Sequence, residues 1–124
     1  IVSAVGVLWL FGAPHELLAT IAPRATTTPV AMDMAAQIGG IPSLAAIIVI
    51  FAGIFGAMTA TPIFNALKIA DYRARGFAVG ISAHGVGTAR AFQVNDTAGA
   101  FASLAMALNA VFTCVLLSLF ALLA

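Results

Sequence analysis

Apolar and charged positions alternate in long blocks along this chain, and the blocks predict membrane-crossing helices. No residue between Asp33 and Lys68 is charged, and residues 43–61 form an almost unbroken apolar run. About 20 apolar residues cross a hydrocarbon core of about 30 Å, so this run predicts a transmembrane helix. The charge-free segment 97–124 predicts a second span that is longer than one crossing needs, which implies tilt or an amphipathic start. Residues 1–11 are apolar but too short to cross alone, so we interpret them as the tail of a longer helix.

Two further segments are too polar or too rich in glycine for ordinary spans. Within residues 14–40, Thr28 followed by Pro29 predicts a helix start, and the helix would end at Gly39-Gly40. Its length of about 15 Å is half of a bilayer. The glycines of residues 76–90 permit non-helical backbone, which is tolerated at membrane depth only inside protein or beside a water-filled cavity. Short interrupted segments of this kind indicate a transporter's binding site.

Composition agrees with a membrane protein and excludes other classes. The chain is 63% hydrophobic and 7% charged, whereas soluble domains are about 25% charged. Its net charge of +1 excludes nucleic acid as a partner. The single cysteine, Cys114, forms no internal disulfide, and the two histidines are too widely spaced for a metal site. We expect no cofactor and no enzymatic activity, because paired carboxylates, an activated nucleophile and a phosphate loop are missing from the sequence.

Several residues of the interrupted segments have competing interpretations. Gly76 and Gly80 have the spacing of small residues at packed helix interfaces. His84 alone fits a hydrogen bond to a neighbouring helix, whereas its polar neighbours in a membrane segment favour a functional role. Arg90 fits a substrate contact, an interfacial anchor or an ion pair with Asp96.

Some residues of the first interrupted segment, residues 14–40, also have interpretations that involve only local hydrogen bonds. Asp33 and Gln37 lie one helical turn apart, so they can form a hydrogen bond on one helix face. The hydroxyls of residues 26–28 can be satisfied as capping groups. We interpret His15 and Glu16, which follow a Gly-Ala-Pro sequence, as an interfacial loop without a chemical role.

Four stretches match a known family in order and spacing. They are PRATTTPVAM at 23–32, GGIPSL at 39–44, RGFAVG at 75–80 and SAHGVGTAR at 82–90. Over roughly residues 20–124 the chain thereby resembles the LrgB/CidB family of bacterial membrane proteins. The family's usual length is about twice this, so the resemblance implies that residues 1–124 form one transmembrane domain, the C-terminal half of a larger protein. Many members have Lys-Ser-Val-Thr-Thr-Pro and a Glu where this chain has RATTTP and Asp33, and these swaps keep charge and hydroxyls.

The resemblance implies two different functions. Bacterial members are described as antiholin-like modulators of murein hydrolase activity and autolysis, acting with a small LrgA/CidA-type membrane partner. Relatives in plant plastids resemble glycolate/glycerate exchangers, and bacterial members have been linked to pyruvate movement. The residues themselves favour a carboxylate transporter, because a holin needs no arginine, histidine and glycine-broken helix at membrane depth.

We therefore expect an all-α, polytopic membrane protein, a helical bundle with three to four spans and two short discontinuous or re-entrant segments that converge on one site. Its expected ligand is a small monocarboxylate of the pyruvate, glycolate or glycerate class. Arginine suits planar carboxylates, and hydroxyls suit their oxygens. The predicted substrate-binding residues are Arg24, Thr27, Thr28, Ser82, His84, Gly85, Gly87, Thr88 and Arg90, and the candidates for a coupled proton are Asp33 and His84.

Two other classes stay open, a holin-like regulator without a substrate and a structural subunit that needs a partner chain. The regulator predicts tolerance of Arg90→Ala and His84→Ala. We place the chain in the bacterial inner membrane, with a small LrgA/CidA-type partner or a second copy of itself as neighbour. The positive-inside rule assigns the basic loop 65–75 to the cytoplasm.

Overall fold

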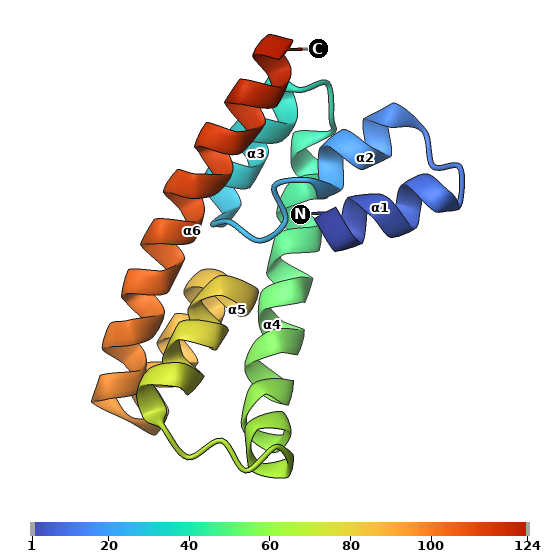
Figure 1. Cartoon of the computed structure of the whole chain (residues 1–124). Helices are drawn as coiled ribbons and strands as arrows, with labels where there is room; N and C mark the ends of the chain where they lie inside the picture. Colours follow the sequence, from blue (N-terminus) through green and yellow to red (C-terminus); the bar gives the residue numbers. More distant parts are fainter. Residues whose placement is uncertain (1, 124) are drawn as a thin grey trace. The chain divides into compact units, whose positions relative to one another are not determined.

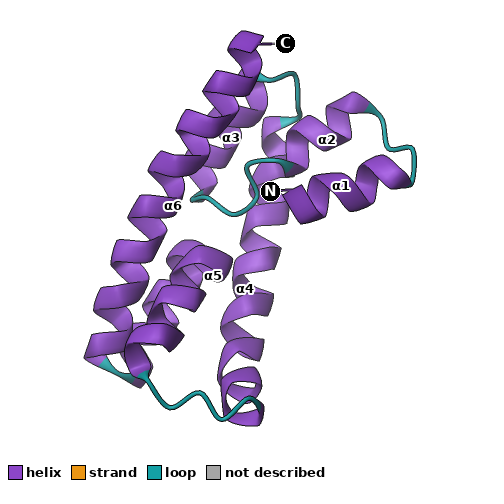
Figure 2. Ribbon diagram, in the orientation of Figure 1, coloured by secondary structure: helices purple, strands orange, loops and turns teal. Residues whose placement is uncertain are grey.

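The computed structural model describes residues 2–123, which form helices joined by short turns (Figures 1 and 2). The helices are α1 (Val2–Leu10), α2 (His15–Ile21), α3 (Thr28–Gln37), α4 (Pro42–Ala66), α5 (Tyr72–Val94) and α6 (Asp96–Leu123). No strand occurs in the described part of the chain, and the predicted all-α class is confirmed. The helices group into two compact units, residues 2–49 with 110–123 and residues 50–109, so α4 and α6 contribute to both.

In the first unit, α1 and α2 are joined by a turn at Gly12, whose φ of 72° favours glycine. The turn ends at Pro14, whose carbonyl accepts hydrogen bonds from the amides of Leu17 and Leu18. These bonds begin α2 immediately after the proline. The interpretation of His15 and Glu16 as loop residues was therefore wrong, because both lie in the first turn of α2.

Helix α3 confirms the short helix predicted from Thr28-Pro29. It ends at Gln37, and Gly39 follows with a φ of 79°, the left-handed conformation that glycine adopts at helix ends. The N-cap is Thr27 rather than Thr28, and its side chain makes no capping hydrogen bond. At ten residues, α3 has about half of the length that crosses a bilayer.

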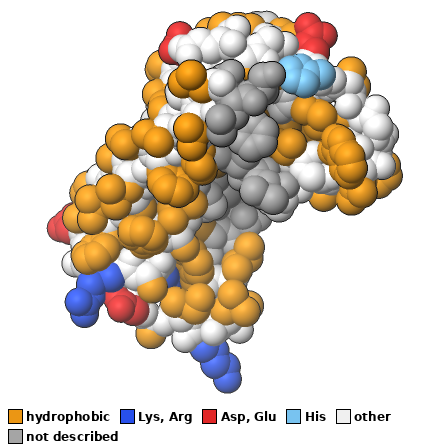
Figure 3. Space-filling view, turned by 45° about the horizontal axis from the view of Figure 1, so that its top comes forward, with side chains coloured by type: hydrophobic (Ala, Val, Ile, Leu, Met, Phe, Trp, Pro, Cys, Tyr) orange, Lys and Arg blue, Asp and Glu red, His pale blue; other side chains and the backbone are white. Residues whose placement is uncertain are grey.

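The long helices α4 and α6 have the length and composition of membrane spans. Their most apolar 18-residue windows are only 17% buried, whereas the core helix of a soluble protein would be mostly buried. Phe51, Phe55 and Met58 of α4 are 69%, 70% and 72% exposed. Hydrophobic side chains cover much of the face seen in Figure 3. Both predicted spans are thus present, while the expected total of three to four stays a prediction.

Helix α5 reverses direction, and this reversal defines the second unit. Its two halves, residues 72–83 and 85–94, meet at His84, which has non-helical backbone. Tyr72 and Val94 line the same small cavity. In one continuous helix they would be about 33 Å apart. α5 is therefore a helical hairpin, whose returning half is visible behind the first in Figure 1.

Small residues hold the hairpin against α6. A Cβ atom at Gly76 would overlap the backbone of Ala98, and a Cβ at Gly80 would overlap that of Ala102. The matching four-residue steps mean that the first half of α5 runs parallel to the start of α6. Packing, one of the two interpretations of these glycines, is thus observed. The core of the unit is built around Val79, Ala83, Ala91, Ala98 and Ala102.

Candidate functional site

The break in α5 lies at His84 itself and not at a glycine. His84 has φ 39° and ψ −130°, a conformation that the Cβ of an L-residue disfavours. Its side chain is 2% exposed. The glycines of residues 76–90 predicted a break in this segment, and the break is present, but at the histidine. Strained backbone at a non-glycine residue is typical of functional sites, where the surrounding structure enforces it.

Contacts within α5 and with α4 surround the hairpin tip. At the start of the returning half, the Thr88 hydroxyl donates a 2.8 Å hydrogen bond to the His84 carbonyl. On α4, glycines leave room for the tip: a Cβ at Gly53 would lie 2.6 Å from His84 Cε1, and one at Gly56 would lie 2.8 Å from the Ala83 Cβ. Gly53 and Gly56 were not predicted as site residues; they are three residues apart, which is not the four-residue spacing of the usual helix-packing motif.

The tip lies level with the middle of a membrane-length helix. Gly53 is about 16 Å along α4 from Pro42 and about 20 Å from Ala66. The first half of α5 is 12 residues long, about 18 Å, which is close to half of a bilayer's thickness. The hairpin therefore turns back beside the middle of α4, and this geometry favours re-entry over crossing for residues 76–90.

The other predicted residues of the second segment have distinct surroundings. The exposed Ser82 donates a 2.7 Å hydrogen bond to the Ala78 carbonyl. Gly85 has open space where a Cβ would lie. Gly87 is buried, and a Cβ there would lie 2.7 Å from Val79 Cγ1 on the opposite half of α5. Gly87 thus permits the two halves to pack, whereas Gly85 is required neither for the break nor for packing.

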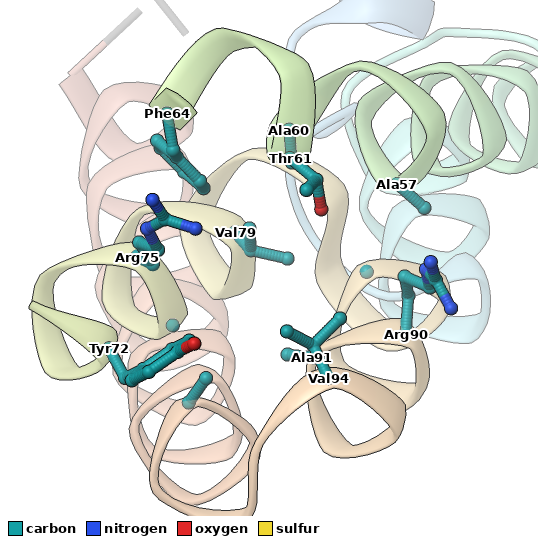
Figure 4. Close-up of a pocket in the computed structure, with 13 residues that line it drawn as sticks. Ala57, Ala60, Thr61, Phe64, Tyr72, Arg75, Val79, Arg90, Ala91 and Val94 are labelled. Atoms are coloured by element: carbon teal, nitrogen blue, oxygen red, sulfur yellow. The ribbon is translucent and has the colours of Figure 1, made fainter. Parts of the chain in front are cut away.

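The exposed Arg90 lies at the edge of a small, partly open cavity that is lined by α4, the two halves of α5 and the start of α6 (Figure 4). The cavity has a volume of about 30 Å³, and Arg75 and Thr61 also line it. A more open recess of about 370 Å³ adjoins Arg90, Thr61, Met58 and Pro62. Arg90 donates a 3.1 Å hydrogen bond to Gln93 Oε1, so its alternative ion pair with Asp96 is not what the structure contains.

Arg75 also lines this cavity, although it was not predicted as a site residue. It was predicted to lie in the basic loop, but it belongs to the first turn of α5. Its Nε donates to the Ile69 carbonyl at 2.6 Å and its Nη2 to Asn65 Oδ1 at 2.9 Å. Its guanidinium also lies 5.8 Å from the centre of the Phe64 ring. These contacts fix its position firmly.

In the first unit, the turn between α2 and α3 carries Arg24. Its Nε atom is buried and has no hydrogen-bond partner among the described residues. Thr26 donates to the Pro23 carbonyl at 2.8 Å, so its hydroxyl proton is used within the turn. Thr27 and Thr28 lie half-buried at the start of α3, the positive end of that helix.

Asp33 lies on an exposed part of α3 and accepts a 2.8 Å hydrogen bond from Gln37. The hydrogen bond predicted from their spacing is confirmed. Each interrupted segment thus gathers its own predicted residues, Arg24 with Thr27 and Thr28 in one unit, and His84 with Thr88 and Arg90 in the other. Their convergence on one site stays a prediction.

These features define an all-α membrane protein in which a helical hairpin carries a buried histidine beside the middle of a long apolar helix. Comparison with known families gives the particular assignment. The chain belongs to the LrgB-like family, whose model matches residues 1–123. The resemblance found in the four motifs is thereby confirmed.

Individual relatives agree with this family assignment. The chain is 37% identical over 101 residues to the uncharacterized protein YxaC of Bacillus subtilis, covering 82% of this chain and 44% of that protein. It is 36% identical over 97 residues to the uncharacterized protein YwbG of the same organism, covering 78% and 43%. It is 29% identical over 110 residues to the "Holin-like protein CidB" of Staphylococcus epidermidis, covering 89% and 48%. The chain therefore spans about half the length of these relatives, and no solved structure matches it.

Proposed function

We propose that this protein carries small monocarboxylates of the pyruvate, glycolate or glycerate class across the bacterial inner membrane. The observation that supports it best is the strained, buried His84 at the tip of a hairpin that ends at mid-depth. A protein that only associates with its neighbours in the bilayer has no need of a helix broken at a histidine. Broken helices at this depth are instead the usual place for a transporter's substrate site.

The first interrupted segment would supply carboxylate recognition. Arg24 has a buried Nε that lacks an acceptor among the described residues, and a carboxylate oxygen would satisfy it. The start of α3 adds a positive dipole end, and no side chain caps it at Thr27. Thr27 and Thr28 have half-buried hydroxyls at the same helix end.

The hairpin would supply the moving parts of the cycle. His84 is the stronger candidate for a coupled proton, because it is buried at the break, whereas Asp33 is exposed and already bonded to Gln37. Thr88 would keep the break in shape through its bond to the His84 carbonyl. Gly87 would act by letting the two halves of α5 pack, and Ser82 through its place beside the tip.

We further propose that the end of the second unit that carries Lys68, Arg73 and Arg75 faces the cytoplasm. The hairpin would then open toward the cytoplasm, which is where a cell holds its metabolic carboxylates. A small LrgA/CidA-type membrane protein or a second copy of this chain is the expected neighbour of the exposed apolar faces.

A second candidate is a holin-like regulator of murein hydrolase activity without a substrate of its own. It is favoured by the holin-like naming of the staphylococcal relatives and by the packing of Gly76 and Gly80 against α6. In this case helix association would be the function. Small-residue faces would then be sensitive to substitution, and the polar residues of the tip would tolerate it.

The test is uptake of labelled pyruvate and glycolate by proteoliposomes that contain the natural full-length protein, under an imposed proton gradient. We expect saturable uptake that is lost in His84→Ala and in Arg24→Ala. Arg73→Ala is the matched control, because Arg73 is exposed and bound only to Asp71, and its uptake should equal that of the wild type. Absence of uptake above that of empty liposomes, with the protein folded and its small partner present, would contradict transport and favour the regulator.

A further inference from the structure

The two interrupted segments of the chain are each followed by the same kind of element. Helices α2 and α3 precede the long helix α4, and the hairpin of α5 precedes the long helix α6. When residues 21–45 are aligned without gaps to residues 81–105, seven of the 25 pairs are identical, whereas this composition alone gives about two or three. The identical pairs are Ile21/Ile81, Thr28/Thr88, Ala31/Ala91, Gly39/Gly99, Ser43/Ser103, Leu44/Leu104 and Ala45/Ala105. The alignment indicates an internal repeat with an offset of 60 residues.

Buried side chains recur at the same offset. One set of these residues lies in the first compact unit and the other set in the second. Agreement of burial at single positions does not follow from a similar composition, because it depends on which face of each helix packs inward. The aligned pairs in which both residues are buried include Ala19/Val79, Thr20/Gly80, Pro23/Ala83, Ala31/Ala91 and Ala45/Ala105.

In both copies the chain leaves a helix, turns back and then packs against that same helix. A Cβ atom at Gly40 would lie 2.7 Å from the amide nitrogen of Thr20, and the Ile41 amide donates a 2.8 Å hydrogen bond to the Thr20 hydroxyl. In one continuous helix, residues 20 and 40 would be about 30 Å apart. Gly80, the residue aligned with Thr20, likewise meets the backbone of Ala102 at the start of α6. Residues 20–40 therefore return to their starting point, as the α5 hairpin does.

The two turns carry basic side chains at one aligned position. Arg24 of the first turn is aligned with His84 of the second, and Thr28 and Thr88 follow at the same distance. The Nε atom of Arg24 and the Nε2 atom of His84 are both buried. The helices that return from the two turns, α3 and residues 85–94, each have ten residues, about 15 Å. Arg24 thus has in the first copy the place that His84 has in the second.

The connection between the copies reverses their direction. Helix α4 is continuous over 25 residues, about 36 Å, which is long enough to cross a hydrocarbon core of about 30 Å. Residues 20–40 return to the start of α4, whereas the α5 hairpin follows its end at Ala66. The two ends of a crossing helix lie on opposite faces of the membrane. A copy made of one returning segment and one crossing helix is therefore followed by a copy with inverted topology.

We propose that residues 15–66 and 72–123 are two copies of one repeat with inverted topology, and that residues 20–40 re-enter the membrane from the face opposite to that of the α5 hairpin. Arg24 is the tip residue of this second re-entrant segment. Because the basic loop 65–75 is assigned to the cytoplasm, the segment of Arg24 opens to the outer face. A small anion from outside the cell then reaches Arg24, and one from the cytoplasm reaches the hairpin of His84. These routes rest on the proposed transport function, whereas the inverted repeat does not.

The test is the accessibility of single cysteines in oriented membrane vesicles that contain the natural full-length protein in a cysteine-free background. Glu16→Cys and Gln37→Cys place thiols at exposed positions near the ends of α2 and α3, and Arg73→Cys and Thr97→Cys do so for the hairpin. With a membrane-impermeant maleimide, we expect positions 16 and 37 to react from one side and positions 73 and 97 from the other. Phe55→Cys, exposed at the middle of α4, is the control and should react from neither side.

Two outcomes would overturn the inverted repeat. Reaction of either pair from opposite sides would do so, because that segment would cross the membrane instead of re-entering it. Reaction of all four positions from one side would also do so, because α4 would not separate the two copies. The transport proposal fails separately: the expected labelling pattern without any uptake of carboxylates would retain the repeat and contradict the carrier.

Discussion

At the scale of single residues, the backbone of His84 is the most informative feature of this protein. Strained non-glycine conformations cost about 1–3 kcal/mol and persist only where the surroundings enforce them. Among the contacts of His84 are the Thr88 hydroxyl on its carbonyl and the close approach of its imidazole to Gly53 of α4. A glycine at position 84 would relieve the strain, and Gly85 is the next residue, so the histidine side chain is retained against a backbone cost.

Replacement of His84 separates the backbone cost from the side chain. We expect His84→Gly to be more stable than His84→Ala by about 1 kcal/mol or more, because both lose the imidazole and only alanine keeps a Cβ at φ 39°. The order is the reverse of that in an ordinary helix, where alanine is favoured by about 1 kcal/mol. Thermal unfolding in detergent measures the difference. Equal stabilities, or a more stable alanine variant, would show that the backbone at 84 is unstrained.

At the scale of helices, the pairing of α5 with α6 depends on the absence of side chains at two positions. Adding a methyl group at Gly80 would force it into the backbone of Ala102, which cannot move independently of its helix. We expect Gly80→Ala to lower the free energy of unfolding by about 1–3 kcal/mol, the usual cost of overpacking.

Gly85→Ala on the same helix is the matched control for this substitution. Its Cβ would enter open space, and its φ is not in the left-handed range, so we expect stability equal to or above that of the wild type. Chemical denaturation of both variants in one detergent makes the comparison. A Gly80→Ala protein as stable as Gly85→Ala would contradict the observed packing.

A second helix-scale contact joins α2 to the start of α4. The buried Thr20 hydroxyl accepts a 2.8 Å hydrogen bond from the Ile41 amide while it donates to the Glu16 carbonyl. Thr20→Val would leave that amide without its acceptor, which we expect to cost about 1–3 kcal/mol. Thr20→Ser keeps the hydroxyl and should lose less. Thermal unfolding that ranks serine no better than valine would show that the hydroxyl bond contributes nothing.

Much of the helical arrangement was predictable from local sequence. Pro29 and Gly39 gave both ends of α3, because proline fits a first helical turn and glycine fits the left-handed end. Charge-free blocks gave α4 and α6. The exact form of α5 was not predictable, since its glycines indicated a break while the conformation of His84 is imposed by α4 and Thr88. Likewise, Arg75 reads locally as a loop cation and joins the cavity only because α5 folds back.

At the scale of the second unit as a whole, the charged residues other than Arg90 lie near one end. Lys68, Asp71 and Arg73 lie at the turn between α4 and α5, and Asp96 begins α6, where the returning half of the hairpin has come back. Long, outward-facing apolar stretches of α4 and α6 extend away from this end. Such a distribution suits a unit whose hairpin enters and leaves the membrane on the same, more basic side.

The most direct test of the re-entrant hairpin, on which the proposed mid-depth position of His84 depends, is cysteine accessibility in oriented membrane vesicles. Single cysteines would be placed at the exposed positions Arg73 and Thr97, in a Cys114→Ala background, and treated with a membrane-impermeant maleimide from either side. We expect both positions to react from the same side, the cytoplasmic one. Reaction of positions 73 and 97 from opposite sides would show that α5 crosses the membrane, and would contradict the hairpin.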